Sequence, residues 1–520
     1  MEQYQTDGIT PRLIIEPRAK NEPESIAFQY TRKKQLYNIT CGQFWREVNA
    51  LGAHFYDSGL RNARIALLGE NSYEWILTWF AAVLSGNIIV PLDKDQASEE
   101  LGILLRRCGS ELLVCSAMYF DVAEKLREDG AVERILSMAE VPALAAGNGD
   151  LDALGVDPSP DTICSIIFTS GTTGEQKGVM LTRRNIASNV INSCNILAYE
   201  AASVLTLPMH HTFGLTVGVL AAYLNGYPIY ISRGLRYFSS ELCSIKPDGI
   251  ILVPLYVETM YKRIWNTAKE QGRDVKLRRA IKVSNALRKV GIDLRGRLFR
   301  QVLDAFGGNL RFVLCGGAFL DQKYIDGLSD VGIDVVNGYG ITECSPVVSV
   351  NRIDNRRRGS VGLPVPGEEV RIVDGEICVR GDNVMVGYLR DPEGTAAAME
   401  DGWFHTGDLG HMDKDGFLYI TGRKKNLIIL SNGENVSAEE LELRLMEIEN
   451  VEEVVVSGGS EGITAEIYAE DRTGIDEAVE VLNRKLPPFK RIAKVKYRDE
   501  EFEKTTSRKI KRVYQTAESV

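Results

Sequence analysis

The chain has 520 residues, 44% of them hydrophobic and 25% charged, which is typical of a soluble globular protein with about three domain-sized units. Its formal net charge of −10 argues against general nucleic-acid binding, so local donors must hold any anionic substrate. Nine scattered cysteines without a Cys-x-x-Cys pair indicate reduced thiols and a cytoplasmic location, and the five histidines show no zinc-site spacing.

The start of the chain lacks the charged-then-apolar pattern of a signal peptide. The most apolar stretches, 75–84 and 213–224, are shorter than the roughly 20 residues that a membrane span requires. We therefore expect no transmembrane segment, and at most a loose membrane association through a lipid substrate.

Residues 38–100 alternate helical and strand patterns. Thr40 and Gln43 form a capping pattern, after which apolar residues recur at helical spacing until Gly59. The predicted segments that follow are a strand at 64–68, a helix at 73–84 and a strand at 88–92. Strand–helix–strand order predicts a parallel sheet with helices on its faces.

A glycine- and hydroxyl-rich segment at 169–178 follows an apolar run, 163–168, that predicts a buried strand. Its glycines and hydroxyl residues leave N–H and O–H donors free to surround an anion, and Lys177 adds a positive charge. Gln176 stands where a Walker loop requires glycine. The composition indicates a phosphate-binding loop, although a surface turn has similar residues.

The strand pattern returns near 310–315 and 333–337, and the character of the chain changes after residue 360. Two strand-like segments, 370–373 and 376–380, flank Asp374-Gly375, a strong hairpin signal. This part predicts a small antiparallel sheet or barrel.

A separate α+β unit is predicted after Arg423. Ser437 and Glu440 form a capping box that opens a helix at 439–447. Strands are predicted near 454–456 and 464–470.

Five motifs in order resemble those of the adenylate-forming superfamily, which contains acyl-CoA synthetases, luciferases and the adenylation domains of peptide synthetases. They are Thr169–Gly178, Asn337–Glu343, Trp403–Asp408, Gly422–Asn426 and Lys504–Arg512. The family usually has glycine where Arg508 stands, which affects the local turn but not the lysine that follows it. The flanking sequence looks most like long-chain fatty acid–CoA ligases.

The resemblance implies an α/β fold with a large N-terminal domain, 1–421, and a small mobile α+β C-terminal domain, 426–520. Parallel sheets flanked by helices and a small β-barrel-like subdomain build the large domain, with subdomains at roughly 1–160, 161–359 and 360–421. The hinge lies at 422–425 and contains Lys425. Such hinges absorb a backbone change far from the chemistry.

The resemblance also implies the residues that bind ATP. They are Thr169, Ser170, Gly171, Thr172, Thr173, Gly174, Lys177, Gly317, Asn337, Gly338, Tyr339, Gly340, Thr342, Asp408, Arg423 and Lys509. The loop and Lys177 hold the β- and γ-phosphates, and Thr342 contacts the α-phosphate. Asn337 and Tyr339 meet adenine.

Further roles follow from the same resemblance. Asp408 and Arg423 hold the ribose, and Glu343 binds Mg²⁺, with Thr172 as a second candidate ligand, because hard cations prefer oxygen. Lys509 bridges the reacting carboxylate and the α-phosphate. The predicted catalytic residues are Lys509, His211 and Glu343.

These assignments predict activation of a carboxylic acid to an acyl-adenylate with loss of pyrophosphate, then transfer to the thiol of CoA. His211 matches a position beside the reacting carboxylate, within 207–214, which lacks the aspartate that amino-acid-activating relatives use. A buried ammonium without a partner is costly, which favours a medium- or long-chain fatty acid.

The thiol acceptor stays open between CoA and the phosphopantetheine of an acyl carrier protein. Gly433 and Glu434 resemble the segment that lines the pantetheine tunnel. A basic cluster could meet either acceptor: Lys485, Lys490, Arg491, Lys494 and Lys496. A phosphotransferase or NTPase and a catalytically silent nucleotide-binding protein are the alternatives from other classes, and the combination of Asp408 with Lys509 counts against both.

Overall fold

The computed structural model describes residues 9–169, 176–194, 203–430, 434–459, 462–504 and 510. The chain forms two compact units. The first comprises Met1–Val370 and Val379–Phe404, and the second comprises Arg371–Cys378 and His405–Val520. The predicted hinge at 422–425 lies inside the second unit, so the predicted domain boundaries stay predictions.

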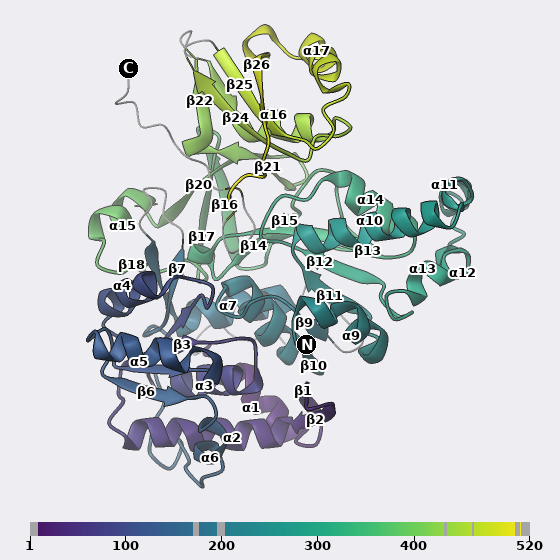
Figure 1. Cartoon of the computed structure of the whole chain (residues 1–520). Helices are drawn as coiled ribbons and strands as arrows, with labels where there is room; N and C mark the ends of the chain where they lie inside the picture. Colours follow the sequence, from purple (N-terminus) through teal and green to yellow (C-terminus); the bar gives the residue numbers. More distant parts are fainter. Residues whose placement is uncertain are drawn as a thin grey trace. The chain divides into compact units, whose positions relative to one another are not determined.

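A seven-stranded sheet forms the first part of unit 1, in the order β18-β8-β7-β4-β3-β5-β6. Figure 1 labels its strands β18, β7, β3 and β6. Its strands are β3 (Arg64–Leu68), β4 (Ile88–Leu92), β5 (Leu112–Cys115), β6 (Arg134–Ser137), β7 (Ile163–Thr169), β8 (Lys177–Thr182) and β18 (Gly387–Tyr388). The strands from β7 to β6 run parallel, whereas β8 pairs antiparallel with β7 and β18 pairs antiparallel with β8.

Helices cover both faces of this sheet because its strands are apolar on both sides. Ala66 and Leu68 of β3 pack with α4 (Ser98–Cys108) and α5 (Phe120–Glu128). The alternate residues Ile65 and Leu67 point to the other face and are also fully buried. The helices α2 (Cys41–Asp57) and α3 (Tyr73–Leu84) pack against each other, and α3 contacts β3 and β4.

The predicted elements in this region are confirmed. Strands β3 and β4 and helix α3 have the predicted bounds. Helix α2 begins where the capping pattern placed it, since Thr40 Oγ1 accepts a hydrogen bond from Gln43 N at 3.2 Å. The α/β fold class with parallel sheets flanked by helices is confirmed as well.

A second sheet of unit 1 has the order β11-β12-β13-β14-β15. Its strands are β11 (Gly249–Leu252), β12 (Phe312–Cys315), β13 (Asp334–Gly340), β14 (Val347–Val350) and β15 (Leu363–Pro364). The strands β11, β12 and β13 are parallel. Strand β14 pairs antiparallel with β13, and β15 pairs antiparallel with β14. Its helices are α10 (Pro254–Glu270), α11 (Asp274–Arg288), α12 (Arg295–Leu298), α13 (Arg300–Asp304) and α14 (Gln322–Asp330).

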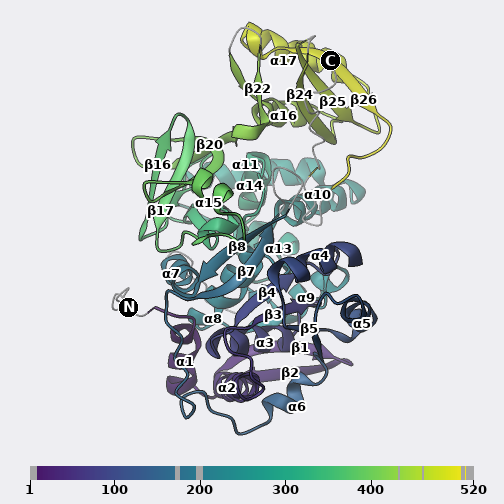
Figure 2. The same cartoon turned by 90° about the vertical axis from the view of Figure 1, so that its left-hand side faces the viewer.

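Unit 1 also contains helix α1 (Arg12–Asn21), which packs against α2, and a four-stranded sheet. Its order is β2-β1-β10-β9, with bounds Gln35–Thr40, Ile26–Arg32, Ile229–Ile231 and Ser203–Leu205. The chain between β9 and β10 winds as a π-helix, Phe213–Ala221, continued by α8 (Ala222–Leu224). From Gly214 onward this π-helix is buried. Unit 1 also contains α7 (Arg183–Cys194), and Figure 2 shows α1 and α2 together at one end of the unit.

A five-stranded sheet contains the predicted hairpin, in the order β16-β17-β20-β19 with β21 paired to β20. Its strands are β16 (Glu368–Val373), β17 (Glu376–Gly381), β19 (Met399–Glu400), β20 (Trp403–Met412) and β21 (Leu418–Arg423). Asp374 and Gly375 have positive φ, of 49° and 82°, as a tight hairpin turn requires.

The end of unit 2 is the predicted α+β part. Its elements are β22 (Leu427–Ile429), β23 (Asn435–Ser437), α16 (Ala438–Met446), β24 (Glu453–Gly459), β25 (Gly462–Tyr468), α17 (Ile475–Lys485) and β26 (Ile492–Arg498). Ser437 Oγ accepts from Glu440 N at 3.2 Å, as the capping box predicted. No helix among the described residues has the length and hydropathy needed to cross a bilayer.

Candidate active site

The two ends of the predicted phosphate loop are joined by the antiparallel pair β7–β8. Thr169 and Lys177 are directly opposite in the register, and Thr169 Oγ1 lies 3.5 Å from the carbonyl oxygen of Lys177. The ammonium of Lys177 lies 4.5 Å from the centre of the Tyr388 ring and 3.8 Å from Asp391 Oδ2. The predicted residues Ser170, Gly171, Thr172, Thr173 and Gly174 lie outside the described residues.

Glu343, the predicted metal ligand, is a buried carboxylate on a 3₁₀ turn, Thr342–Cys344, directly after β13. Tyr388 OH donates to Glu343 Oε1 at 2.9 Å. Burial, with the charge of Glu343, raises the pKa of Tyr388, so the phenol stays protonated and remains a donor. Tyr388 therefore contacts both Glu343 and the lysine of the phosphate loop. Sequence reasoning missed it, because no local pattern distinguishes this tyrosine.

The predicted adenine segment forms the end of β13. A side chain at Gly338 would meet the carbonyl oxygen of Ser349 at 2.9 Å, and one at Gly340 would collide with the carbonyl of Pro346. Both glycines are therefore required by the close approach of β14. Tyr339 is 8% exposed.

Asn337 has its side chain fixed by protein partners. Its Nδ2 donates to the carbonyl oxygen of Ser360 at 3.1 Å, and its Oδ1 accepts from Asn351 Nδ2 at 2.9 Å. A carboxamide oxygen has two lone pairs, so Oδ1 keeps one acceptor position. The contacts of Asn337 and Tyr339 with adenine remain predictions.

The predicted acyl-pocket segment lies next to Thr342. Thr212 Oγ1 is 3.5 Å from Thr342 Oγ1, and the ring of Phe213 packs where a side chain at Gly316 would stand, within 2.8 Å. Gly317 follows with φ of +85°, a conformation that favours glycine. The structure thus brings 212–213, the Gly316-Gly317 turn and Thr342 together.

Two adjacent histidines sit in this segment. The rings of His210 and His211 are 4.2 Å apart, and His210 Nε2 is 3.6 Å from Asp93 Oδ1. Burial, together with His211, lowers the pKa of His210 to about 3, so His210 is neutral at physiological pH. His211, the predicted catalytic histidine, is partly exposed beside it.

In unit 2, the predicted ribose-binding residues form an ion pair. Asp408 on β20 is directly opposite Arg423 on β21, and Arg423 Nε lies 2.8 Å from Asp408 Oδ1. Asp408 is 4% exposed, and its backbone N–H donates to Thr406 Oγ1 at 3.1 Å. A carboxylate has further lone pairs, so this pair leaves room for ribose hydroxyls.

Glu376 organises the residues around that pair. Its carboxylate accepts from Lys424 Nζ at 2.9 Å and from Gly407 N at 2.9 Å, and it lies 3.2 Å from His405 Nδ1. Burial alone would raise the pKa of Glu376, but the hydrogen bonds from Lys424, His405 and Gly407 lower it. Glu376 thereby connects the part of β20 just before Asp408 to Lys424, which precedes Lys425 within the predicted hinge. Sequence reasoning missed Glu376 too.

Fewer contacts are described for the remaining predicted residues. Lys509 and Gly433 lie outside the described residues, and Glu434 is exposed. Lys425 is part of a 3₁₀ turn, Lys424–Asn426. Within the basic cluster, Lys490 Nζ pairs with Glu440 Oε2 at 2.6 Å. The described residues contain no group of three or more His, Cys, Asp or Glu side chains suited to a metal.

A buried carboxyl group, Glu368, supports the turn that carries Glu343. Asn189 Nδ2 donates to Glu368 Oε1 at 2.8 Å. Asn383 Nδ2 donates to the carbonyl oxygen of Cys344 at 3.0 Å. Glu368 Oε2 and Asn383 Oδ1 are both buried acceptors without a donor among the described residues. Burial raises the pKa of Glu368 to about 9, against the hydrogen bond from Asn189, so this carboxyl group is protonated at neutral pH.

Glu368→Gln should change how stability depends on pH. Because its pKa is raised, Glu368 binds a proton more tightly in the folded than in the unfolded protein. Wild-type unfolding free energy should therefore fall between about pH 5 and 9, by at most about 1.4 kcal/mol per pH unit from this group. Glutamine keeps a neutral donor and acceptor. Thermal unfolding across this range should show the variant gaining stability relative to wild type as pH rises; parallel profiles would contradict the neutral carboxyl.

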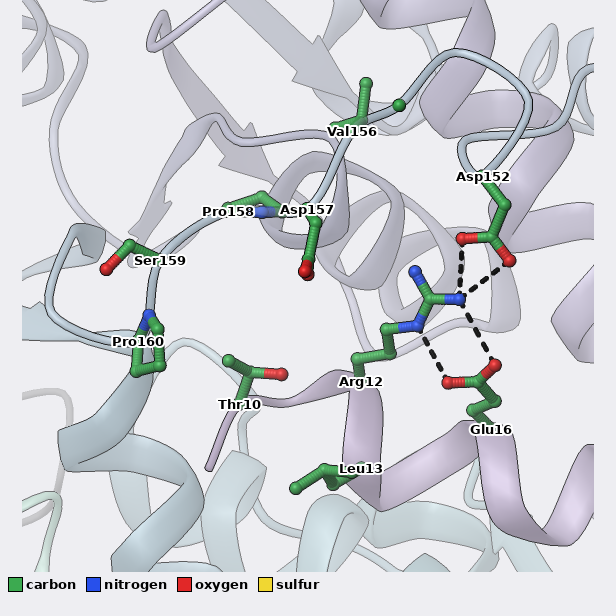
Figure 3. A pocket seen from close by; sticks show the side chains of 11 residues that line it. Thr10, Arg12, Leu13, Glu16, Asp152, Val156, Asp157, Pro158, Ser159 and Pro160 are labelled. Atoms are coloured by element: carbon green, nitrogen blue, oxygen red, sulfur yellow. Dashed lines mark hydrogen bonds and ion pairs between the residues drawn. The ribbon is translucent and has the colours of Figure 1, made fainter. Parts of the chain in front are cut away.

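A cavity of about 550 Å³ lies between α1 and residues 152–160 (Figure 3). Arg12 points between two carboxylates, with Nε 2.7 Å from Glu16 Oε2 and Nη2 2.6 Å from Asp152 Oδ1. The hydrogen bond from Arg12 lowers the pKa of Glu16 to about 2. The pair with Asp152 joins α1 to residues 152–160, and none of the predicted site residues lines the cavity.

Comparison with known proteins decides the family. The model of the AMP-binding enzyme family matches residues 15–389. The chain belongs to this family. Enzymes of the family use ATP, and this AMP-binding enzyme is an acid–thiol ligase of the AMP-forming type.

Individual relatives differ in the acid that their names state. The chain is 28% identical over 474 residues to the long-chain-fatty-acid–CoA ligase FadD15 of Mycobacterium bovis, covering 84% of this chain and 78% of the relative. It is 30% identical over 471 residues to the indoleacetate–CoA ligase of Aromatoleum aromaticum, covering 85% and 84%. The ATP-bound structure of MatB from Rhodopseudomonas palustris superposes with a TM-score of 0.80 at 23% identity, covering 96% and 97%, and shows the shared fold.

Proposed function

We propose that this AMP-binding enzyme activates a medium- or long-chain fatty acid with ATP and transfers the acyl group to the thiol of CoA. The observation that carries the proposal is the contact of one side chain, Tyr388, with both Lys177 and Glu343. This contact supports a shared triphosphate site, in which Lys177 would bind the outer phosphates and Glu343 would offer an oxygen ligand to Mg²⁺.

The first step is an in-line displacement at phosphorus. A carboxylate oxygen of the acid attacks the α-phosphorus of ATP, the bond to the bridging oxygen breaks, and pyrophosphate leaves. When bound, Mg²⁺ neutralises phosphate charge. The protein contributes position and charge: Lys177 meets the outer phosphates, Thr342 the α-phosphate, and Lys509 the two reacting groups.

The second step makes the thioester. The sulfur of the thiolate attacks the acyl carbonyl carbon, and the carbon–oxygen bond to AMP breaks. AMP leaves with the bonding electrons, and the thiol proton goes to solvent. Asp408 and Arg423, fixed against each other by their ion pair, hold the ribose during both steps.

The substrate proposal rests on the segment around His211. Unlike a pocket for an amino acid, 207–214 offers no carboxylate to an ammonium, and the π-helix that follows is buried and apolar. The long-chain-fatty-acid–CoA ligase FadD15 and the indoleacetate–CoA ligase among the relatives favour an apolar acid over an amino acid.

The activity test measures products and chain length together. With a fatty acid, ATP, Mg²⁺ and CoA, we expect AMP, pyrophosphate and the acyl-CoA, not ADP. Each methylene buried in the pocket contributes about 0.8 kcal/mol, so kcat/KM should rise with chain length until the pocket is full. Acid-dependent ADP without AMP would overturn adenylation. Better turnover of indoleacetate, short polar acids or amino acids would overturn the fatty-acid assignment alone.

The acceptor is tested separately. We expect CoA to accept the acyl group, with phosphopantetheinylated carrier protein as the competing acceptor. Lys485, Arg491 and Lys496 are exposed and suit either anionic partner. Thioester formation on carrier protein with none on CoA would replace CoA as the acceptor while leaving the first step intact.

A further inference from the structure

A cationic surface of unit 1 contrasts with the acidity of the whole chain. Residues 273–300 contain ten Lys or Arg and two Asp, a net charge of +8, whereas the chain has a formal net charge of −10. The segment comprises α11, α12 and the turn between them. Figure 1 shows α11, α12 and α13 at the outer edge of the helices that accompany the second sheet.

The cations of α11 have a single acidic neighbour along the helix, Asp274 at its first position. Residues 275–292 contain no Asp or Glu. They contain six cationic residues: Lys276, Arg278, Arg279, Lys282, Arg288 and Lys289. None of the six has an ion pair within the described part of the chain. The guanidinium carbon of Arg278 lies 4.7 Å from the centre of the Trp265 ring. By contrast, Arg295 pairs with Asp293 and Asp334, so this arginine is neutralised.

Aliphatic side chains are exposed among these cations. They are Val275, Val283, Val290, Ile292 and Leu298, with exposed fractions of 54%, 57%, 71%, 48% and 46%. Solvated helix faces are normally polar, so repeated exposure of Val, Ile and Leu on one segment indicates an interaction surface.

Helical geometry separates the two faces of α11. Leu277, Ala280 and Ile281 pack against the core of the second sheet, and Ser284 is fully buried. At 100° per residue, Val275, Arg279, Lys282, Val283 and Ala286 share the opposite face. The outward face is therefore cationic and aliphatic at once.

We propose that this surface, residues 273–300, docks the enzyme on the surface of an anionic phospholipid bilayer. The unpaired cations of the outward side, Arg279 and Lys282 among them, complement an anionic headgroup layer, and exposed valines and isoleucine can enter the boundary between headgroups and acyl chains. A single-stranded nucleic acid would fit less well, because such sites use aromatic side chains for stacking, and the exposed apolar residues here are aliphatic. The proposal does not depend on which acid the enzyme activates.

The test uses the full-length protein and sedimentation with vesicles. We expect the wild type to bind vesicles of phosphatidylcholine mixed with phosphatidylserine, to bind pure phosphatidylcholine vesicles weakly, and to lose binding as salt increases. The double variant Arg279→Glu/Lys282→Glu should lose at least about tenfold in vesicle affinity, because four charge units change on the outward face.

A matched control changes the net charge by the same amount at a different place in unit 1. Arg106 and Lys125 are exposed cations near the ends of α4 and α5, and Arg106→Glu/Lys125→Glu alters the net charge equally. This control should bind vesicles as wild type does. Val283→Asn should weaken binding even at low salt, which a purely electrostatic attraction would not predict. Turnover of a water-soluble acid should be unchanged in every variant, which verifies folding.

Three outcomes would overturn the proposal. These are no wild-type binding to anionic vesicles, equal losses in the α11 and control variants, and binding to RNA or to an acidic polypeptide through Arg279 and Lys282 without binding to vesicles. Failure of the fatty-acid assignment would leave vesicle binding unaffected, so the two proposals are tested independently.

Discussion

Glu343→Gln should lower acid-dependent ATP–pyrophosphate exchange by about 10²-fold or more. Glutamine has nearly the same shape and still accepts the hydrogen bond of Tyr388, which reaches Oε1 at 2.9 Å in the wild type. The variant therefore removes the negative charge offered to Mg²⁺ and little else. Raising the Mg²⁺ concentration should recover part of the exchange.

Tyr388→Phe is the matched comparison. It keeps the carboxylate of Glu343 and the aromatic ring over which Lys177 lies, but removes the hydroxyl donor. We expect a smaller loss than in Glu343→Gln, with a shifted Mg²⁺ dependence. Both variants should unfold near the wild-type temperature. Near-normal exchange by Glu343→Gln at ordinary Mg²⁺ would remove this residue from the metal site.

The sequence predicts those parts of the fold whose signals are local. Strands β3 and β4 and helix α3 have the predicted bounds because each combines an unbroken apolar pattern with clear ends. The hairpin at Asp374-Gly375 and the start of α16 at Ser437 are equally local, since a turn and a cap each involve only neighbouring residues.

The site is less predictable because its partners are far apart in sequence. Tyr388 and Glu343 are 45 residues apart, Lys424 and Glu376 are 48 apart, and Glu368 lies 179 residues from Asn189. The resemblance identified Glu343, whereas Tyr388, Glu376 and Glu368 emerged only from the packing. It also assigned Gly338 and Gly340 to nucleotide binding, although close packing against β14 already requires glycine at both positions.

Substitutions of the two predicted lysines of unit 2, Lys509 and Lys425, should each impair a different half-reaction. Lys509→Ala should reduce adenylate formation by about 10²–10³-fold, because a positive charge is lost where the carboxylate meets the α-phosphate. Thioester formation from supplied acyl-adenylate should be largely retained. Lys511→Ala removes a neighbouring charge and should leave both steps near the wild-type rates.

Lys425→Pro should show the opposite pattern. Proline fixes φ in the 3₁₀ turn Lys424–Asn426, where we propose that the backbone changes between the two steps. Adenylate formation should continue, and transfer to CoA should slow. Lys425→Ala removes the charge without the backbone restraint, so it should transfer faster than the proline variant.

Half-reaction assays with supplied acyl-adenylate decide between these patterns. The side chain of Lys424 remains in every variant, so its 2.9 Å contact with Glu376 can continue to anchor this residue of the hinge. Equal loss of both steps in Lys509→Ala and Lys425→Pro would refute a two-position mechanism for this enzyme, even if the overall activity were confirmed. An equal defect in Lys425→Ala and Lys425→Pro would instead assign the role of this residue to its charge.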